Sequence, residues 1–233
     1  MTAETGEAAN FSINPVRVFF DGTSKTSTVT VKNESDEEIT LQLKAYKWQQ
    51  DAEGKDVYFP TTDIVYFPKI AKIKGSEEKI IRLGAEMPRD KLEKTYRLYL
   101  EEIPAPSAAE TTTVKIVMKV GVPIFISPVD VEPKGSIEKA EVSDGNLDLV
   151  VKNEGNIHFI IKAIRIAGTD DSGGEIYKTD LGGKYLLGGN SKDFRFQLPR
   201  EECHKLKALN IDIDTDRLSL GKKLDLDRKK CPL

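Results

Sequence analysis

Apolar and polar residues alternate along Thr111–Pro128, one of the longest periodic runs in the chain. The apolar face of this run carries Val114, Ile116, Met118, Val120 and Val122. A period of two residues predicts a long β-strand. Pro123 and Pro128 lack the N–H group that a central strand donates, so we expect this strand at the edge of a sheet.

A long edge strand with an apolar row is unusual in a soluble protein, because its unpaired backbone groups invite pairing with another chain. Two explanations are open at this point. The row faces the core of its own sandwich, or the strand pairs with a partner.

Short β-branched or aromatic segments separated by turn residues precede this strand. They are Phe11–Phe20, Thr26–Lys32, Thr40–Trp48, Lys69–Leu83 (broken at Gly75 and Ser76) and Thr95–Ile103. A connector with Pro133 and Gly135 follows the long strand. A second series then comprises Lys139–Val142, Leu147–Lys152, Phe159–Ala167, Glu175–Thr179, Ser191–Leu198 and Leu206–Ile213.

Strands at this spacing without helical patterns predict an all-β protein with two immunoglobulin-like β-sandwich domains in tandem. We place the domains at residues 9–128 and 136–233, with a linker at 129–135. Thr28–Asn33 and Leu149–Asn153 resemble each other, since each is an alternating strand that ends in Lys-Asn before a turn. This is a weak tandem likeness.

Composition limits the partners. Among 233 residues, 35 basic residues nearly balance 38 acidic ones, so we expect no nucleic-acid partner. No apolar run approaches the roughly 20 residues that span a bilayer, so we expect no membrane insertion. Residues 1–10 lack the basic start and apolar middle of a secretion signal, and we expect a mature form whose signal has been removed.

Both cysteines, Cys203 and Cys231, lie in the last fifth of the chain. His204 is adjacent to Cys203, but the other histidine, His158, is distant in sequence, and no metal-ligand cluster surrounds the pair. A disulfide is a simpler account than a zinc site or a Cys–His nucleophile. Such a bond would stabilise the fold by about 3–4 kcal/mol and would persist only in an oxidising compartment.

Two other segments resemble known binding motifs but lack residues that those motifs require. Asp212, Asp214 and Asp216 imitate a calcium loop, but Arg217 and Lys223 stand where glycine and glutamate are needed. We expect a strand whose carboxylates face water. The glycines of Leu181–Asn190 lack phosphate-loop spacing. We therefore expect no catalytic residues, no metal, no cofactor and no enzymatic activity.

Several segments together resemble the PapD-like periplasmic chaperones of the chaperone–usher pathway. The segments are Val16–Gly22, Ile81–Leu83, Tyr96–Pro104, Pro123–Pro128, Asn153–His158 and Tyr185–Gly189. The resemblance covers nearly the whole chain and implies a boomerang-like pair of sandwiches with an interdomain cleft. It also implies a periplasmic, ATP-independent chaperone that binds, folds and caps pilus or fimbrial subunits by donor-strand complementation and delivers them to an outer-membrane usher.

The resemblance also implies site residues. Val114, Ile116, Met118 and Val120 would fill the groove of the subunit, and Arg17 would anchor its terminal carboxylate. The best-known members carry a lysine where this chain has Pro123, and an interdomain arginine where it has Ser127, which is typical of a divergent branch. Arg97 is a substitute cation. Cys203 and Cys231 are similar to the second-domain disulfide of some members, at a wider spacing.

Alternatives from other classes stay open. One is an extracellular two-domain adhesion or structural protein whose long strand is covered internally. Another is an intracellular immunoglobulin-like module that recognises acidic peptides, which would need a concentrated basic face. For Arg17, the alternative is an exposed residue or a local ion pair. Self-association is one way in which an unbound chaperone would cover its apolar row.

Overall fold

A computed structural model describes residues 10–86, 88–104 and 117–231, and nearly all of its regular structure is β-strand. The chain forms two compact units. Unit 1 comprises residues 1–49, 58–90 and 94–127, and unit 2 comprises residues 50–57, 91–93 and 128–233. Each unit contains two sheets around one apolar core, which confirms the predicted all-β fold.

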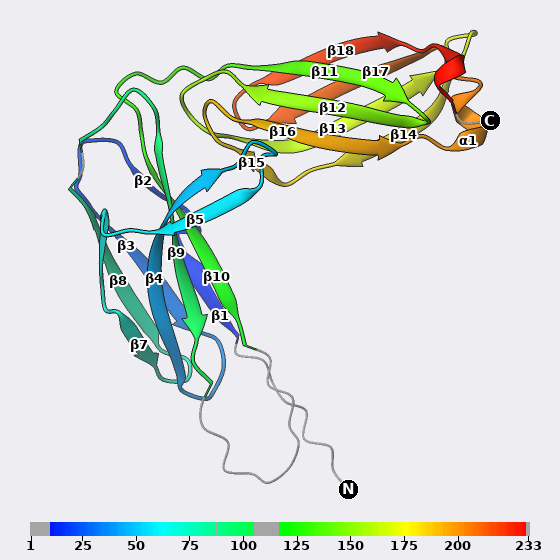
Figure 1. The fold of residues 1–233 in the computed structure, drawn as a ribbon. Helices are drawn as coiled ribbons and strands as arrows, with labels where there is room; N and C mark the ends of the chain where they lie inside the picture. The colour runs from blue at the N-terminus through cyan, green and yellow to red at the C-terminus, as the bar shows by residue number, and fades with distance from the viewer. Residues whose placement is uncertain (1–9, 87, 105–116, 232–233) are drawn as a thin grey trace, which may run out of the picture. The chain divides into compact units, whose positions relative to one another are not determined.

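Unit 1 is a sandwich of two sheets whose strands pair in antiparallel fashion, apart from one parallel pair (Figure 1). The first sheet has the order β1 (Phe11–Asn14), β3 (Thr26–Asn33), β8 (Glu78–Ala85) and β6 (Ile64–Phe67). The second has the order β2 (Val18–Phe20), β10 (Lys119–Ile126), β9 (Lys94–Glu102), β4 (Ile39–Gln50) and β5 (Asp56–Pro60), with β7 (Ile70–Ile73) also on β4. Inward-facing residues of both sheets form the core.

The segment predicted as one strand, Phe11–Phe20, is in fact two strands in different sheets. β1 pairs with β3, and after Pro15 the chain crosses to the second sheet, where β2 runs parallel to β10. The prediction that the long strand lies at a sheet edge is therefore wrong for the C-terminal part of that strand. Residues 124–126 lie between β9 and β2, and only residues 119–123 have β9 alone beside them among the described residues.

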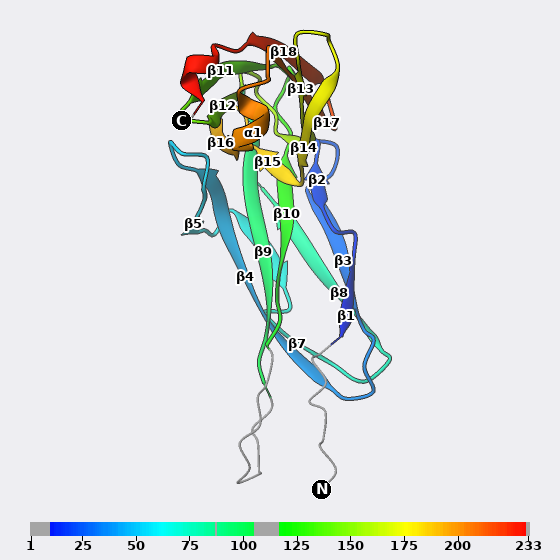
Figure 2. The same ribbon diagram turned by 90° about the vertical axis from the view of Figure 1, so that its right-hand side faces the viewer.

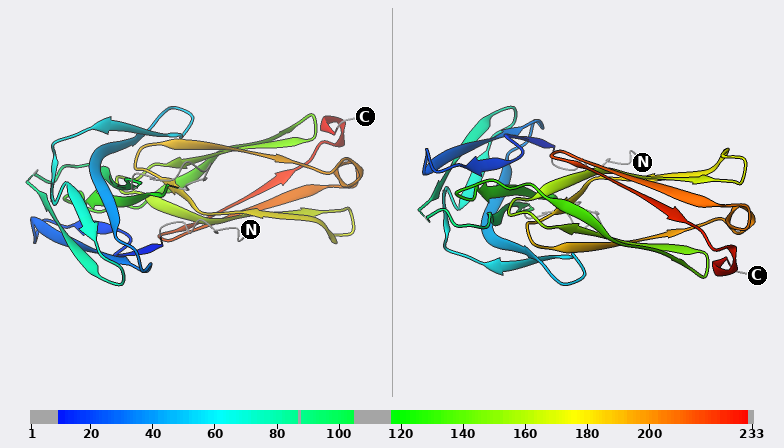
Figure 3. Two further views of the ribbon diagram at one scale, coloured as in Figure 1. Left: turned by 90° about the horizontal axis from the view of Figure 1, so that it is seen from below. Right: turned by 90° about the horizontal axis from the view of Figure 1, so that it is seen from above.

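Unit 2 repeats the two-sheet arrangement. One sheet has the order β11 (Gly135–Ser143), β12 (Asn146–Asn153) and β16 (Ser191–Gln197). The other has the order β14 (Glu175–Leu181), β13 (Phe159–Thr169), β17 (Ala208–Thr215) and β18 (Ser219–Asp225), with β15 (Lys184–Leu186) also on β13. Figure 3 shows β17 and β18, in orange and red, running side by side. Asp212 is exposed on β17, as predicted.

A buried asparagine organises the same turn in each unit. The Asn33 side-chain amide donates to the carbonyls of Glu37 (2.7 Å), Ile73 (3.1 Å) and Lys74 (3.1 Å). Asn153 donates to the carbonyls of Ile157 (2.9 Å) and Leu186 (3.0 Å). In both units the first acceptor lies four residues after the asparagine. Both asparagines are fully buried, and each bridges backbone carbonyls from two segments of its unit.

The tandem likeness extends beyond these asparagines. Ser12 donates to Glu34 at 2.8 Å in unit 1, and Ser136 donates to Glu154 at 2.9 Å in unit 2. Each glutamate directly follows the buried asparagine of its unit. The two sandwiches thus repeat one hydrogen-bonded frame, which the Lys-Asn pattern of the sequence marks.

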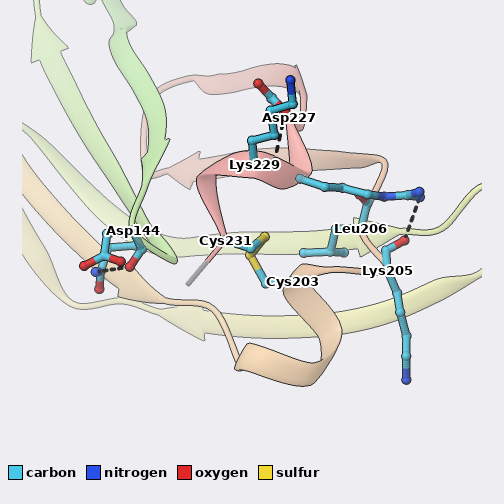
Figure 4. The surroundings of a disulfide bond; sticks show 9 residues. Asp144, Cys203, Lys205, Leu206, Asp227, Lys229 and Cys231 are labelled. Carbon is cyan, nitrogen blue, oxygen red and sulfur yellow. Dashed lines mark hydrogen bonds between the residues drawn. A yellow bond between two sulfur atoms is a disulfide. The ribbon is translucent and has the colours of Figure 1, made fainter. Parts of the chain in front are cut away.

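The disulfide between Cys203 and Cys231 is present, as predicted. It joins α1 (Arg200–Cys203) to the residue after the 3₁₀-helix η1 (Arg228–Lys230) and closes a loop that contains β17 and β18 (Figure 4). Nearby, Arg228 Nε donates to the Leu206 carbonyl at 3.2 Å. The bond therefore fastens the C-terminal segment to the core of unit 2.

Replacing Asn33 with alanine should lower the free energy of unfolding of unit 1 by about 2–3 kcal/mol, because one buried and two partly buried carbonyls lose their donor. Urea unfolding followed by the fluorescence of Trp48, the single tryptophan, reports on this unit. The matched control is Ser24→Ala in the same unit, whose hydroxyl makes an exposed bond to the Thr26 carbonyl. A loss no larger than that of the control would contradict a structural role for Asn33.

Removal of the disulfide by Cys203→Ala and Cys231→Ala should lower the free energy of unfolding by about 3–4 kcal/mol, because the closed loop spans 28 residues. Urea unfolding followed by far-UV circular dichroism measures the change. The unmodified protein with and without a reducing agent provides the control. A loss below about 1 kcal/mol would mean that the loop is held by packing alone.

Candidate functional site

The candidate site lies along β10 of unit 1. Figure 2 shows β10 beside β9, and the two strands pair over eight residues from Lys119 opposite Glu101 to Ile126 opposite Lys94. Because side chains alternate, this register puts two distinct rows of residues on the two faces of the strand. One row faces the core, and the other faces outward.

The core-facing row contains two of the residues predicted to bind a partner. Met118 and Val120 are partly buried and pack against the end of the core of unit 1, while Val122 is fully buried. Val114 and Ile116 lie outside the described residues. Val117 belongs to the opposite face and is 47% exposed. The row therefore continues the alternation, but its burial declines toward the start of β10.

Backbone pairing along β10 changes at Pro123. β2 begins opposite Ile124, whereas β9 accompanies the whole strand, and the Glu102 amide donates to the Met118 carbonyl at 2.9 Å. Among the described residues, the other edge of residues 119–123 has no strand beside it. A strand of another chain could pair there and continue the sheet.

Arg97 lies on β9, on one side of Pro123, and Arg17 directly precedes β2, on the other side of β10. Arg97 is directly opposite Pro123 on β9. Arg17 is exposed, and it immediately precedes Val18, which is opposite Ile124 on β2. The register thus brings the two predicted anchor residues to the two sides of one position on β10.

The guanidinium of Arg97 lies on an aromatic surface. Its Cζ is 4.1 Å from the ring centroid of Trp48 and 5.7 Å from that of Tyr58. Trp48 is 1% exposed, and its ring centroid is 6.0 Å from that of Phe125 on β10. The sequence does not reveal the arginine on Trp48, because the contact joins two neighbouring strands, β4 and β9, that are far apart along the chain.

Further along the same outward row, charged and aromatic groups pack together. Lys119 Nζ is 3.0 Å from a Glu101 carboxylate oxygen and 4.7 Å from the ring centroid of Tyr99. Lys44 Nζ is 3.3 Å from the other oxygen of Glu101. Hydrogen bonds from Lys119 and Lys44 lower the pKa of Glu101, and the bond to Glu101 raises the pKa of Lys119. These charges satisfy one another, whereas the Nε of Arg97 is buried and has no hydrogen-bond partner among the described residues.

Other site classes find little support in the described part of the chain. No group of three or more histidine, cysteine, aspartate or glutamate side chains there could hold a metal ion. Among residues 10–86, 88–104 and 117–231, no helix is long and apolar enough to cross a membrane.

Solved structures of low sequence identity share this fold. One is a chain of the CsuC–CsuE chaperone–tip adhesion subunit pre-assembly complex from archaic chaperone-usher Csu pili of Acinetobacter baumannii. It is 20% identical, with 91% of this chain and 98% of that chain covered and a TM-score of 0.62. A chain of the Salmonella enterica SafA pilin–SafB chaperone complex is 14% identical, with 94% and 99% covered and a TM-score of 0.58. The Pseudomonas aeruginosa CupB2 chaperone is 12% identical, with 93% and 100% covered and a TM-score of 0.56.

No curated protein sequence matches the chain. Residues 10–132, more than half of the chain, match the family described as pili and flagellar-assembly chaperone, PapD N-terminal domain. Members of that family are assembly chaperones and not enzymes, in agreement with the expectation from the sequence. The chain therefore belongs to the PapD-like family of pilus-assembly chaperones.

Proposed function

We propose that this chaperone works in the periplasm, where it binds, folds and caps pilus subunits by donor-strand complementation. It then delivers them to an outer-membrane usher without using ATP. The observation that carries the proposal is the edge of β10 over residues 119–123, which has no strand beside it among the described residues, next to a row of apolar side chains whose burial declines toward the start of the strand.

The lent strand supplies two kinds of interaction. Val114, Ile116, Met118 and Val120 fill the groove that an incomplete immunoglobulin-like subunit leaves open. Each such side chain contributes about 1.5–3 kcal/mol when it is fully buried. Backbone pairing along the open edge of β10 adds direction and register. The subunit then stays folded, and it cannot polymerise until the extension of another subunit replaces the lent strand.

The terminal carboxylate of the subunit is held by Arg17 and Arg97. The two arginines flank Pro123, which itself offers neither a cation nor an N–H donor. A planar guanidinium donates two parallel hydrogen bonds to a carboxylate, so arginines suit this task. The contact fixes where the end of the subunit lies against β10.

Two further observations support the compartment and the class of partner. A disulfide such as Cys203–Cys231 persists in an oxidising compartment, and the periplasm is one. Two of the similar structures are complexes of a chaperone with a tip adhesion subunit and with a pilin. Pilus subunits are thus the partner class that we propose for this chain.

Met118→Asp should abolish capture of the cognate subunit, because a buried carboxylate replaces an apolar side chain in the subunit groove. The measurement is co-purification after periplasmic co-expression with candidate subunits from the same locus. Val117→Asp is the matched control, because Val117 is adjacent but belongs to the opposite, exposed face. Equal capture by both variants would move binding away from this row, and no capture by the parent would favour the adhesion-type protein.

Arg17→Ala and Arg97→Ala should each lower subunit capture about tenfold, because each removes hydrogen bonds to a charged group. Competition between tagged variants for a limiting amount of subunit measures the ratio. Arg82→Ala is the control, since Arg82 is an exposed arginine on β8 in the other sheet of unit 1. Capture equal to that of the control would mean that the carboxylate is bound elsewhere.

A further inference from the structure

We infer that Gly121 and Trp48 are positioning residues for Arg97, and that together they form a receptor for the terminal carboxylate of a subunit before any subunit binds. The inference rests on the proposed function, and it explains how this chain manages without a cation at position 123. All three residues belong to unit 1, on β10, β4 and β9.

Gly121 provides space and not backbone freedom. A Cβ atom at this position would lie 2.7 Å from Arg97 Cδ, 3.1 Å from Arg97 Cγ and 2.9 Å from Tyr99 Cε1. The φ angle of Gly121 is outside the left-handed region, so any residue could adopt this backbone conformation. A glycine inside a strand weakens the strand. At position 121, however, the absence of a Cβ atom lets the side chain of Arg97 pass close to β10.

Trp48 provides the surface on which the guanidinium lies. The ring also contacts Phe125, whose own ring stacks on Phe19 at a centroid distance of 5.3 Å. Stacking on an aromatic face uses the positive charge of arginine but none of its N–H donors. The Nη donors in the plane of the guanidinium therefore stay available for the two oxygens of a carboxylate.

The Nε of Arg97 is buried, so a carboxylate would be met by the Nη groups of this partly exposed side chain and not by the Nε itself. Among the described residues it has no acceptor, although donors at a buried position are usually satisfied. Glu101, four residues further along β9, is engaged by Lys44 and Lys119. The arginine is thus ordered without being neutralised, which lowers the entropy lost when a ligand binds.

The first test needs no partner. Trp48 is the single tryptophan, so its fluorescence reports directly on the arginine that covers it. Arg97→Ala and Gly121→Ala should shift Trp48 emission in the same way. Gly84→Ala is the matched control, because a Cβ there would meet no atom closer than 3.7 Å. Emission of Gly121→Ala equal to that of the control would overturn the positioning role.

The second test uses the subunit captured by the unmodified chaperone. Gly121→Ala should lower capture about tenfold. Extending the C-terminus of the subunit by two glycines should weaken capture by the parent, but should add no further loss in Gly121→Ala. Arg97→Lys should also lose capture, because lysine keeps the charge without the planar fork. This second variant tests the receptor even if Gly121→Ala does not fold.

The outcomes separate this inference from the function on which it rests. Shifted Trp48 emission with full capture by Gly121→Ala would overturn the carboxylate receptor while strand lending stands. Loss of capture by Gly121→Ala that is just as large for the extended subunit would overturn it as well. Failure of the parent to capture any subunit would instead refute the proposed function.

Discussion

The pairing register between β9 and β10 is the constraint on which the site depends. A slip of one residue would turn every side chain of β10 to the other face of the sheet. In the observed register Met118 and Val120 face the core side, while Gly121 lies opposite Tyr99 and Pro123 opposite Arg97. One backbone alignment therefore sets an apolar row on one face of the strand and a cationic position on the other.

Unit 2 also has edge strands among the described residues, and its last strand differs in charge from β10. β18 ends its sheet in unit 2 as the partner of β17, and its sequence includes Lys222 and Lys223. Lysines on an edge strand discourage pairing with another chain. Residues 119–123 of β10 carry one lysine, Lys119, which Glu101 engages. Two sandwiches with one hydrogen-bonded frame thus differ at the edge where a partner strand would add.

Alternation with period two identified most strands, because it reflects burial on one face and needs no knowledge of distant residues. The division of Phe11–Phe20 between two sheets was not predictable in this way, since the parallel partner β10 lies more than a hundred residues away. β18 was not predicted, because its two leucines are separated by a glycine and two lysines and its sequence shows no regular alternation. Cys203 and Cys231 were paired correctly because no other cysteine competes. The stacking of Arg97 on Trp48 required three-dimensional packing.

An apolar row alone leaves one ambiguity in the position of a bound subunit. A slip of two residues keeps the same side chains facing the groove, so burial hardly distinguishes the two alignments. The same slip moves the end of the subunit by about 7 Å along the strand, which is beyond hydrogen-bond reach of a fixed guanidinium. An arginine that is ordered in advance by Trp48 and Gly121 penalises the slipped alignment more strongly than a mobile one would. The carboxylate receptor would therefore select the register, while the apolar row supplies most of the binding free energy.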